Sequence, residues 1–476
     1  MLKQEIINFI NENQNILNDA SDKIWDLAEI KFSVEKSSEI LCDILAKEGF
    51  TIEKGICGMS NAFVATIGSG KPVIGLLAEY DALPGMSQVA DSHEKKASCS
   101  SENGHGCGHN ALGVGSVAAG IALASLIKQN KLNATIKVFG TPAEEIGYGK
   151  AYMAKEGAFD NLDCIMTWHP MSAPGVWGFS TLAVNQLYFE FKGVSSHAGA
   201  APELGRSALD AAEIMNIGTQ FLREHIIDSA RVHYAFLDVG GTAANVVQPT
   251  AKLHYFVRAP KQKDANAITD RIIKIANGAA MMTETEVKVT WDAAAAEYIV
   301  NQTMGNVMYE NLSQVVPTYS KEAYEYAKPF FDGQADLVKV GLEGRFRAMF
   351  PNASEEEIKK MASSPISDVL APCSYPSAPM TASTDVGDAS WFAPTGQIVL
   401  PYGCNGSGPH SWQWVAMGKS EIAHTAVTTA GKVIAMSAVD LIQNPELLNK
   451  AKEEHIKNLN GQTYKSVMPD YCKPEI

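Results

Sequence analysis

The stretch VIGLLAE, residues 73–79, is almost wholly apolar. Apolar runs without alternation are typical of strands that are buried on both faces, as in a parallel sheet. Similar runs at residues 134–139 and 163–168 are separated from it and from each other by helical patterns at 111–129 and 150–155. Because strands and helices alternate along this part of the chain, we expect an α/β domain with a doubly wound sheet.

Beyond residue 182 the pattern changes to a strict alternation of polar and apolar residues. Three alternating strands and two amphipathic helices follow one another at residues 186–191, 207–225, 252–258, 265–277 and 286–291. This alternation is typical of a sheet that is covered on one face only. The sequence therefore predicts a small α+β domain, residues 182–296, inserted into a larger α/β domain of residues 1–181 and 297–476.

The composition of the 476-residue chain excludes several classes of protein. With 46% hydrophobic and 19% charged residues, the chain can build a packed core and has too few charges for a disordered protein. Its net charge of −14 argues against a general nucleic-acid binder. It has neither an apolar run of about 18 residues nor a signal-peptide core, and its eight cysteines lack the spacing of a secreted scaffold. We therefore expect a cytoplasmic protein with free thiols and no membrane partner.

The densest cluster of potential metal ligands lies in GHGCGHN, residues 104–110. Cys107 and His109 stand two residues apart, and the glycines around them let the backbone fold tightly enough for both side chains to face one ion. A glycine-rich helix entry with an incidental thiol is the alternative interpretation. A zinc knuckle would need a second Cys/His pair of suitable spacing, and none lies nearby in the sequence.

Further candidate ligands follow the ends of two predicted strands. Glu144 and Glu145 come after one strand, and His169 ends the next. Open α/β sheets bind ligands beyond the carboxyl ends of their strands, so these groups and Cys107 are expected at one edge of the sheet. His410, in a glycine-rich loop near the end of the chain, can return to the same edge. Taken singly, the glutamates could be solvated loop residues and each histidine could be structural.

Together these residues exceed the needs of one tetrahedral ion. Three histidines, a thiol and a carboxylate suit two divalent ions about 3.5–4 Å apart with an activated water between them. Adjacent carboxylates raise each other's pKa unless a cation separates their roles, so Glu144 is predicted as a general base beside the ligand Glu145. Sulfur and imidazole ligands favour zinc, and the oxygen ligands leave room for manganese. The residues thus predict a dinuclear metallohydrolase.

Eight segments spread over nearly the whole chain carry a resemblance to a known family. They are EYDALPG (79–85), GHGCGHN (104–110), GTPAEE (140–145), WHP (168–170), SSHAGAAPELGRSALDA (195–211), NVVQPTAKLHYFVRAP (245–260), STDVGDASW (383–391) and GSGPHSWQ (406–413). Together they resemble the dinuclear metallopeptidases and amidohydrolases that include carboxypeptidase G, aminoacylase and the plant auxin-conjugate hydrolases. The resemblance implies a zinc-exopeptidase-like catalytic domain with an inserted ferredoxin-like domain that serves for dimerisation or as a lid.

The resemblance also implies a role for each matching residue. The implied metal ligands are Cys107, His109, Glu145, His169 and His410. Glu144 would be the general base, and Asp81 would orient a neighbouring catalytic group, although it could instead only form its turn. His197 would reach the active site of a partner chain and stabilise the carbonyl oxygen as it gains charge. Asn245 and Arg258 would grip the carboxylate of the substrate, although Arg258 could instead be a surface charge.

Within this family, GHGCGHN and STDVGDASW are most similar to a branch that splits p-aminobenzoyl-glutamate, a folate breakdown product, into p-aminobenzoate and glutamate. Asn110, where the auxin-conjugate branch has aspartate, argues against that other branch. The enzymes of the similar branch consist of two homologous subunits, so a homodimer, a heterodimer and activity only with a homologous partner all remain open.

A dipeptidase or an N-acyl-amino-acid amidohydrolase of the same family is the alternative activity. A glutamate side chain would need a second cation besides Arg258, and the candidates are Arg206, Lys252 and the lysines of residues 300–375. A non-catalytic chain or a metal store is disfavoured, because neither would use Glu144.

Overall fold

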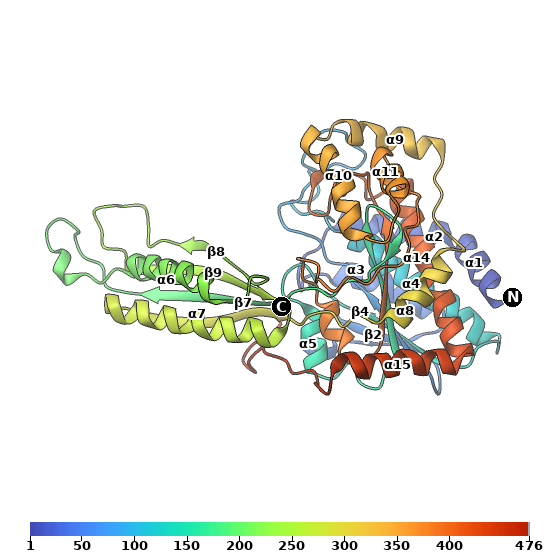
Figure 1. Ribbon diagram of the computed structural model, residues 1–476, viewed down its shortest axis with the longest axis horizontal. Helices are drawn as coiled ribbons and strands as arrows, with labels where there is room; N and C mark the ends of the chain where they lie inside the picture. Colours follow the sequence, from blue (N-terminus) through green and yellow to red (C-terminus); the bar gives the residue numbers. More distant parts are fainter. Residues whose placement is uncertain (475–476) are drawn as a thin grey trace.

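A mixed sheet of seven strands runs through the larger part of the molecule in the computed structural model, which describes residues 1–474 (Figure 1). These strands are β1 (Thr51–Lys54), β2 (Phe63–Gly68), β3 (Val73–Ala78), β4 (Thr135–Gly140), β5 (Cys164–Met171), β6 (Gly175–Val176) and β11 (Thr395–Pro401). Their spatial order is β1-β2-β4-β3-β5-β11-β6. The central strands β4, β3, β5 and β11 are parallel, as predicted, and antiparallel strands extend both edges.

Helices cover both faces of this sheet. They are α1 (Leu2–Glu12), α2 (Gln14–Leu27), α3 (Glu35–Lys47), α4 (His109–Lys128), α5 (Gly149–Lys155), α8 (Gln302–Leu312), α9 (Lys321–Asp332), α10 (Asp336–Met349), α11 (Glu355–Ser363), α12 (Val386–Ser390), α13 (Trp412–Ala416), α14 (Glu421–Gln443) and α15 (Pro445–Leu459). By length and composition α4 and α14 could cross a membrane, yet 89% and 78% of their most apolar stretches are buried inside the protein. Burial on nearly all sides explains why α4 is apolar almost all round, whereas α14 keeps a few charged residues, among them Glu421 and Lys432, on its less buried side.

Neighbouring side chains of β3 point to opposite faces of the sheet. Leu76 packs into the core that contains α4 and α14, and Leu77 packs into a second core that contains α5. Because both faces are covered, the strand is apolar throughout. A Cβ atom on Gly113 of α4 would stand 2.4 Å from the backbone oxygen of Glu79, just after β3. This close approach fixes the start of α4 against the end of β3.

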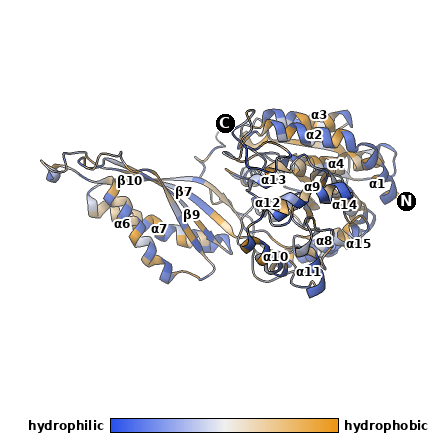
Figure 2. Cartoon of the chain, turned by 90° about the horizontal axis from the view of Figure 1, so that it is seen from above, coloured by the Kyte–Doolittle hydropathy of each residue, from blue (hydrophilic) through white to orange (hydrophobic). Residues whose placement is uncertain are grey.

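A second sheet, of four strands among the described residues, forms the arm drawn green to yellow in Figure 1. The arm contains β7 (Ala183–Lys192), α6 (Ala208–Leu222), β8 (Arg231–Asp238), β9 (Thr250–Ala259), α7 (Gln262–Thr283) and β10 (Glu286–Ala295). Its strand order, β10-β7-β9-β8 with antiparallel neighbours, is ferredoxin-like. Figure 2 shows α6 and α7 on the same side of this sheet. Neither α6 nor α7 covers the other face of the sheet.

The predicted elements of the arm are confirmed, but β8 was not predicted. Seven of its eight residues are exposed, including Tyr234, Phe236 and Leu237, and it forms one edge of the sheet. Because β8 does not alternate between a buried and a solvated face, its sequence lacks the pattern that marks the other strands.

Replacing Gly113 with alanine is expected to destabilise the protein by about 1–3 kcal/mol, because α4 would have to move away from β3. The matched control is Gly344→Ala in α10, where a Cβ atom meets nothing within 4 Å. We expect that control to stabilise the protein by about 0.5–1 kcal/mol, since alanine favours a helix. Urea denaturation measures both effects, and equal midpoints for the two variants would contradict the close packing of α4 on β3.

Candidate metal centre

The carboxyl ends of the central strands and the start of α4 meet at one edge of the larger sheet. Asp81 follows β3, Glu144 and Glu145 follow β4, His169 lies near the end of β5, and His109 begins α4. This is the edge at which open α/β sheets bind ligands. The predicted convergence of these residues is therefore present in the structure.

Two sets of potential metal ligands share the sulfur of Cys107. The first set is Cys107, His109 and His169, and the second is Cys107, Glu145 and His410. Within each set the ligand atoms lie within 4.8 Å of one another. The Cys107 sulfur lies 3.5 Å from His169 Nε2, and Glu145 Oε2 lies 3.2 Å from His410 Nε2. Two ions with Cys107 between them would fit this arrangement.

Buried ligand atoms without hydrogen bonds also indicate metal binding. Among the described residues, Glu79 Oε2, His109 Nε2 and Glu145 Oε1 are buried and make no hydrogen bond. His109 Nε2 and Glu79 Oε2 lie 3.2 Å apart as an ion pair. A buried polar atom without a hydrogen bond costs about 1–3 kcal/mol, and a bound cation would offset that cost for these three atoms. Carboxylate, imidazole and thiolate are all ligands of divalent metals, and the residues present therefore fit a metal pair.

The pKa values of two proposed ligands are consistent with binding to a cation. Burial and the positive charge of His109 lower the pKa of His169 to about 4, which keeps His169 in the neutral form that coordinates metals. Burial and the charge of Glu145 raise the pKa of the Cys107 thiol above its usual value. A sulfur in these surroundings needs a cation beside it to ionise.

Asp81 contacts two of the candidate ligands at once. Its Oδ1 lies 3.1 Å from His109 Nδ1, and its Oδ2 accepts a hydrogen bond from the Glu145 backbone N–H at 3.0 Å. Burial would raise the pKa of Asp81, but the hydrogen bond and the charge of His109 hold that pKa below its usual value. This contact fixes the His109 ring, as expected for a group that orients a metal ligand.

Glu144 belongs to neither of the two sets that share Cys107, but it forms a third group of potential ligands with Glu79 and His109. Its Oε2 is 4.0 Å from His109 Nε2. Burial and the negative charges of Glu79 and Asp385 raise its pKa well above the usual value. A carboxyl group with a raised pKa is suited to accepting and returning a proton near neutral pH.

A buried charge network that sequence reasoning did not identify lies behind Glu144. Lys150 Nζ lies 2.8 Å from Glu79 Oε1 and 2.5 Å from Asp385 Oδ1, and all three side chains are buried. Burial opposes the charge on Lys150, yet the two carboxylates raise its pKa above the usual value. Glu79 and Asp385 lie in EYDALPG and STDVGDASW, two of the segments that carry the family resemblance, so the sequence did mark these two positions. Lys150 lies in a short helical pattern, and no motif in the sequence marked it as a functional residue.

A cavity of about 350 Å³ adjoins Glu144 and Glu145. Residues of both the larger domain and the inserted arm line it. The inserted arm contributes Arg258, whose Nη1 donates a hydrogen bond to Ser383 Oγ at 2.8 Å. This volume lies in the range of small-molecule sites. Arg258 is thus near the candidate ligands, as predicted.

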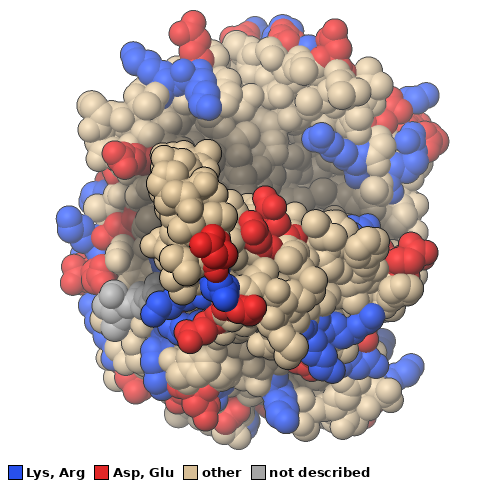
Figure 3. All heavy atoms as spheres, turned by 90° about the vertical axis from the view of Figure 1, so that its left-hand side faces the viewer, with Lys and Arg blue, Asp and Glu red and all other residues tan. Residues whose placement is uncertain are grey.

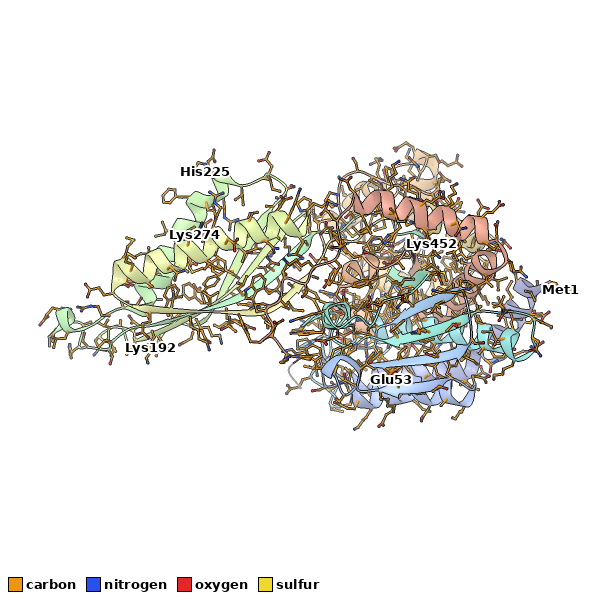
Figure 4. The ribbon with its side chains drawn as sticks, turned by 90° about the horizontal axis from the view of Figure 1, so that it is seen from below. Met1, Glu53, Lys192, His225, Lys274 and Lys452 are labelled. Carbon is orange, nitrogen blue, oxygen red and sulfur yellow. The ribbon has the colours of Figure 1, made fainter. Side chains whose placement is uncertain are left out.

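His197 and Asn245 are not brought to this cavity within one chain. Both are exposed in loops beyond Lys192, which ends β7 well away from the larger domain (Figure 4). They are neighbours there, since the Ala198 N–H donates to the Asn245 carbonyl at 2.9 Å. A role for either residue at a metal centre requires a second chain.

None of the suggested second cations lines the cavity among the described residues. Arg206 Nε pairs with Glu284 at 2.7 Å, and Lys252 pairs with Glu190 at 2.6 Å. No lysine of residues 300–375 is in its wall. Lys31, which sequence reasoning did not consider, lines it instead.

Comparison with known proteins gives the family. A profile of peptidase family M20/M25/M40 matches residues 75–413. One of the two subunits of the p-aminobenzoyl-glutamate hydrolase of Escherichia coli is 39% identical, over 99% of both chains. The other subunit of that E. coli hydrolase is 29% identical, over 47% of this chain and 53% of its own length.

The fold agrees with that of a solved structure. A dinuclear metal-binding peptidase of family M20 from Bacillus subtilis superposes with a TM-score of 0.55 at 18% identity, over 92% of this chain and 99% of its own. The extent of the family match and the 39% identity to the E. coli relative are decisive. The chain is a metallohydrolase and belongs to peptidase family M20/M25/M40.

Proposed function

We propose that this chain hydrolyses the amide bond of p-aminobenzoyl-glutamate and releases p-aminobenzoate and glutamate. The observation that carries the proposal is the pair of ligand sets sharing Cys107 beside Glu144. The name of the 39% identical relative supports the substrate. Arg258 in the wall of the cavity supports it as well, because the substrate carries a carboxylate next to the amide that is cut.

The five proposed ligands would hold two divalent ions, either zinc or manganese. They are Cys107, His109, Glu145, His169 and His410. When bound, the ions would supply a water of lowered pKa and positive charge beside the carbonyl oxygen. Asp81 would keep the His109 ring in place through their contact at 3.1 Å.

The residues of the chain would carry out the proton transfers and hold the substrate. Glu144 takes a proton from the attacking water and returns it to the departing nitrogen of glutamate. Arg258, together with Asn245 of the second chain, holds the carboxylate. His197 of that second chain would donate a hydrogen bond to the carbonyl oxygen as it gains negative charge.

We further propose that residues 182–296 form a dimerisation domain on a catalytic domain of residues 1–181 and 297–476. The exposed apolar side chains of the edge strand β8 support this, because an open edge with apolar residues is a template for pairing. Figure 3 looks onto the far end of the arm, where large areas carry no charged side chain. The second chain is either another copy or a homologue. A cytoplasmic location and a role in folate breakdown complete the proposal, and the eight free cysteines are consistent with that location.

The proposed function is tested by assaying the purified chain alone, stripped of metal and then reloaded with zinc or manganese. The substrates are p-aminobenzoyl-glutamate and a panel of dipeptides and acyl-amino acids. We expect activity only after reloading and a preference for p-aminobenzoyl-glutamate. A preference for another amide would contradict the proposed substrate but would leave the proposed metal-dependent hydrolysis in place. If the chain is inactive alone and active with a homologous partner, the heterodimer is supported.

Replacing Glu144 with glutamine is expected to lower kcat by about 10²–10⁴-fold and to leave the metal content unchanged, because the two sets that share Cys107 hold the ions without Glu144 in this proposal. Glu145→Gln is the matched control, and this variant should lose metal. Elemental analysis beside the kinetic assay separates the two effects. Loss of metal from the Glu144 variant would contradict its assignment as a base.

Replacing His197 with alanine is expected to lower kcat by about 10²–10³-fold through loss of a donor to the carbonyl oxygen. Differently tagged copies allow purification of a mixed dimer in which one chain carries Glu144→Gln and the other His197→Ala. One site of this dimer combines an intact Glu144 with an intact His197 of the other chain, so activity should return. A mixed dimer as inactive as each single variant would show that His197 does not act across the interface.

A further inference from the structure

The cavity of about 350 Å³ beside Glu144 and Glu145 is lined by two basic side chains that come from different domains. Arg258 lies on β9 of the arm, and Lys31 lies in the short turn between α2 and α3 of the larger domain. We infer that Lys31 binds the side-chain carboxylate of the amino acid that is released, and that it thereby selects substrates with an acidic amino acid. This inference rests on the proposed amide hydrolysis at the same cavity.

The backbone of the turn is tied to the metal-binding edge. The Ser33 N–H donates to the Ile30 carbonyl at 3.0 Å and closes the turn around Lys31. Ile30 pairs with Ala82, and the Ala82 N–H donates to the Glu29 carbonyl at 2.7 Å. Ala82 directly follows Asp81, which contacts His109. The position of Lys31 is therefore set by the same loop that orients a proposed metal ligand.

The neighbouring residue Phe32 anchors the turn from the other side. Its ring is buried and meets Tyr152 edge to face, with 6.0 Å between the ring centres. A Cβ atom on Gly147 would stand 2.8 Å from the Phe32 ring, so the loop that carries Glu145 packs directly on Phe32.

Lys31 itself has a φ of +55°, a left-handed conformation that is strained for lysine. Strain of this kind is common at functional sites, where the surrounding structure enforces it.

The wall of the cavity carries two cations, Lys31 and Arg258, one for each carboxylate of an acidic amino acid. Its acidic lining residues are Glu144, Glu145 and Asp292, and Asp292 pairs with His254 at 3.2 Å. With Arg258 on the carboxylate next to the amide, the second cation of the wall can bind a carboxylate on the side chain. A charged hydrogen bond in a partly enclosed site discriminates strongly against a neutral side chain.

A second cavity, of about 390 Å³, continues from the first and shares Lys31 with it. Its wall includes Lys252, Lys288 and Lys473. Lys252 and Lys288 both pair with Glu190 of the same wall, at 2.6 and 3.8 Å, so their charges are already compensated. Lys288 lines only the second cavity and supplies a matched control.

The test compares three substrates: p-aminobenzoyl-glutamate, its side-chain amide and its α-carboxamide. Methionine in place of Lys31 keeps the length and the unbranched shape of the side chain, so the turn should still form. We expect Lys31→Met to lower kcat/KM for p-aminobenzoyl-glutamate by about 10–100-fold. The kcat/KM for the side-chain amide should stay unchanged. Lys31→Arg should retain part of the preference, and Lys288→Met should keep all of it.

An equal loss on all three substrates would make Lys31 a structural residue and overturn the inference. Loss of discrimination against the α-carboxamide alone would also overturn it, because Lys31 would then bind the other carboxylate. If the wild-type chain cleaves other amides only, the same comparison with C-terminal glutamate and glutamine still tests Lys31.

If no amide is cleaved, calorimetric titration of the metal-loaded chain with free glutamate and glutamine replaces the assay. If Lys31→Met binds glutamate more weakly than the wild-type chain does and Lys288→Met does not, the inference is supported even though p-aminobenzoyl-glutamate is not cleaved. A wild-type chain that binds both amino acids equally would overturn it.

Discussion

The structure depends on a concentration of buried negative charge at one edge of the larger sheet. The carboxylates there are Glu79, Asp81, Glu144 and Asp385, and the buried cations beside them are Lys150 and His109. Carboxylates are not stable in a protein interior unless they are paired, hydrogen-bonded or protonated. Lys150 compensates two of them, His109 contacts a third, and the raised pKa of Glu144 marks the remaining excess. Divalent ions would offset that excess, so metal affinity and the basicity of Glu144 have one physical origin.

The two domains divide the work at the cavity. The larger domain supplies every proposed metal ligand. His410 comes from the loop before α13, and the others come from strand ends and the start of α4, where tight backbone contacts such as that of Gly113 leave little freedom. The inserted arm brings Arg258 to the cavity from β9 and carries His197 at its far end. Under the proposed function, the larger domain would position the reacting groups, and the arm would recognise the substrate and the second chain.

Much of this arrangement could be predicted from the sequence, because its signals are local. Burial of both faces makes β3 uniformly apolar, and the glycines around Cys107 mark a loop folded around a ligand. Lys150 and Lys31 escaped prediction because their partners lie far away along the chain and no local pattern marks them. The strand β8 escaped because its apolar residues face solvent instead of a core, so the usual alternation is lost.

The insertion of the arm also affects the order in which the centre can assemble. The strand β11 pairs in parallel with β5, with Thr395 opposite Ile165, although the whole arm lies between them in the chain. Domains fold as units during synthesis from the N-terminus. Cys107, His109 and His169 emerge from the ribosome before the arm, whereas His410 follows β11 near the end of the chain. The proposed ligands of one ion are thus all present on a half-made chain, whereas the set for the second ion would be complete only when synthesis is almost finished.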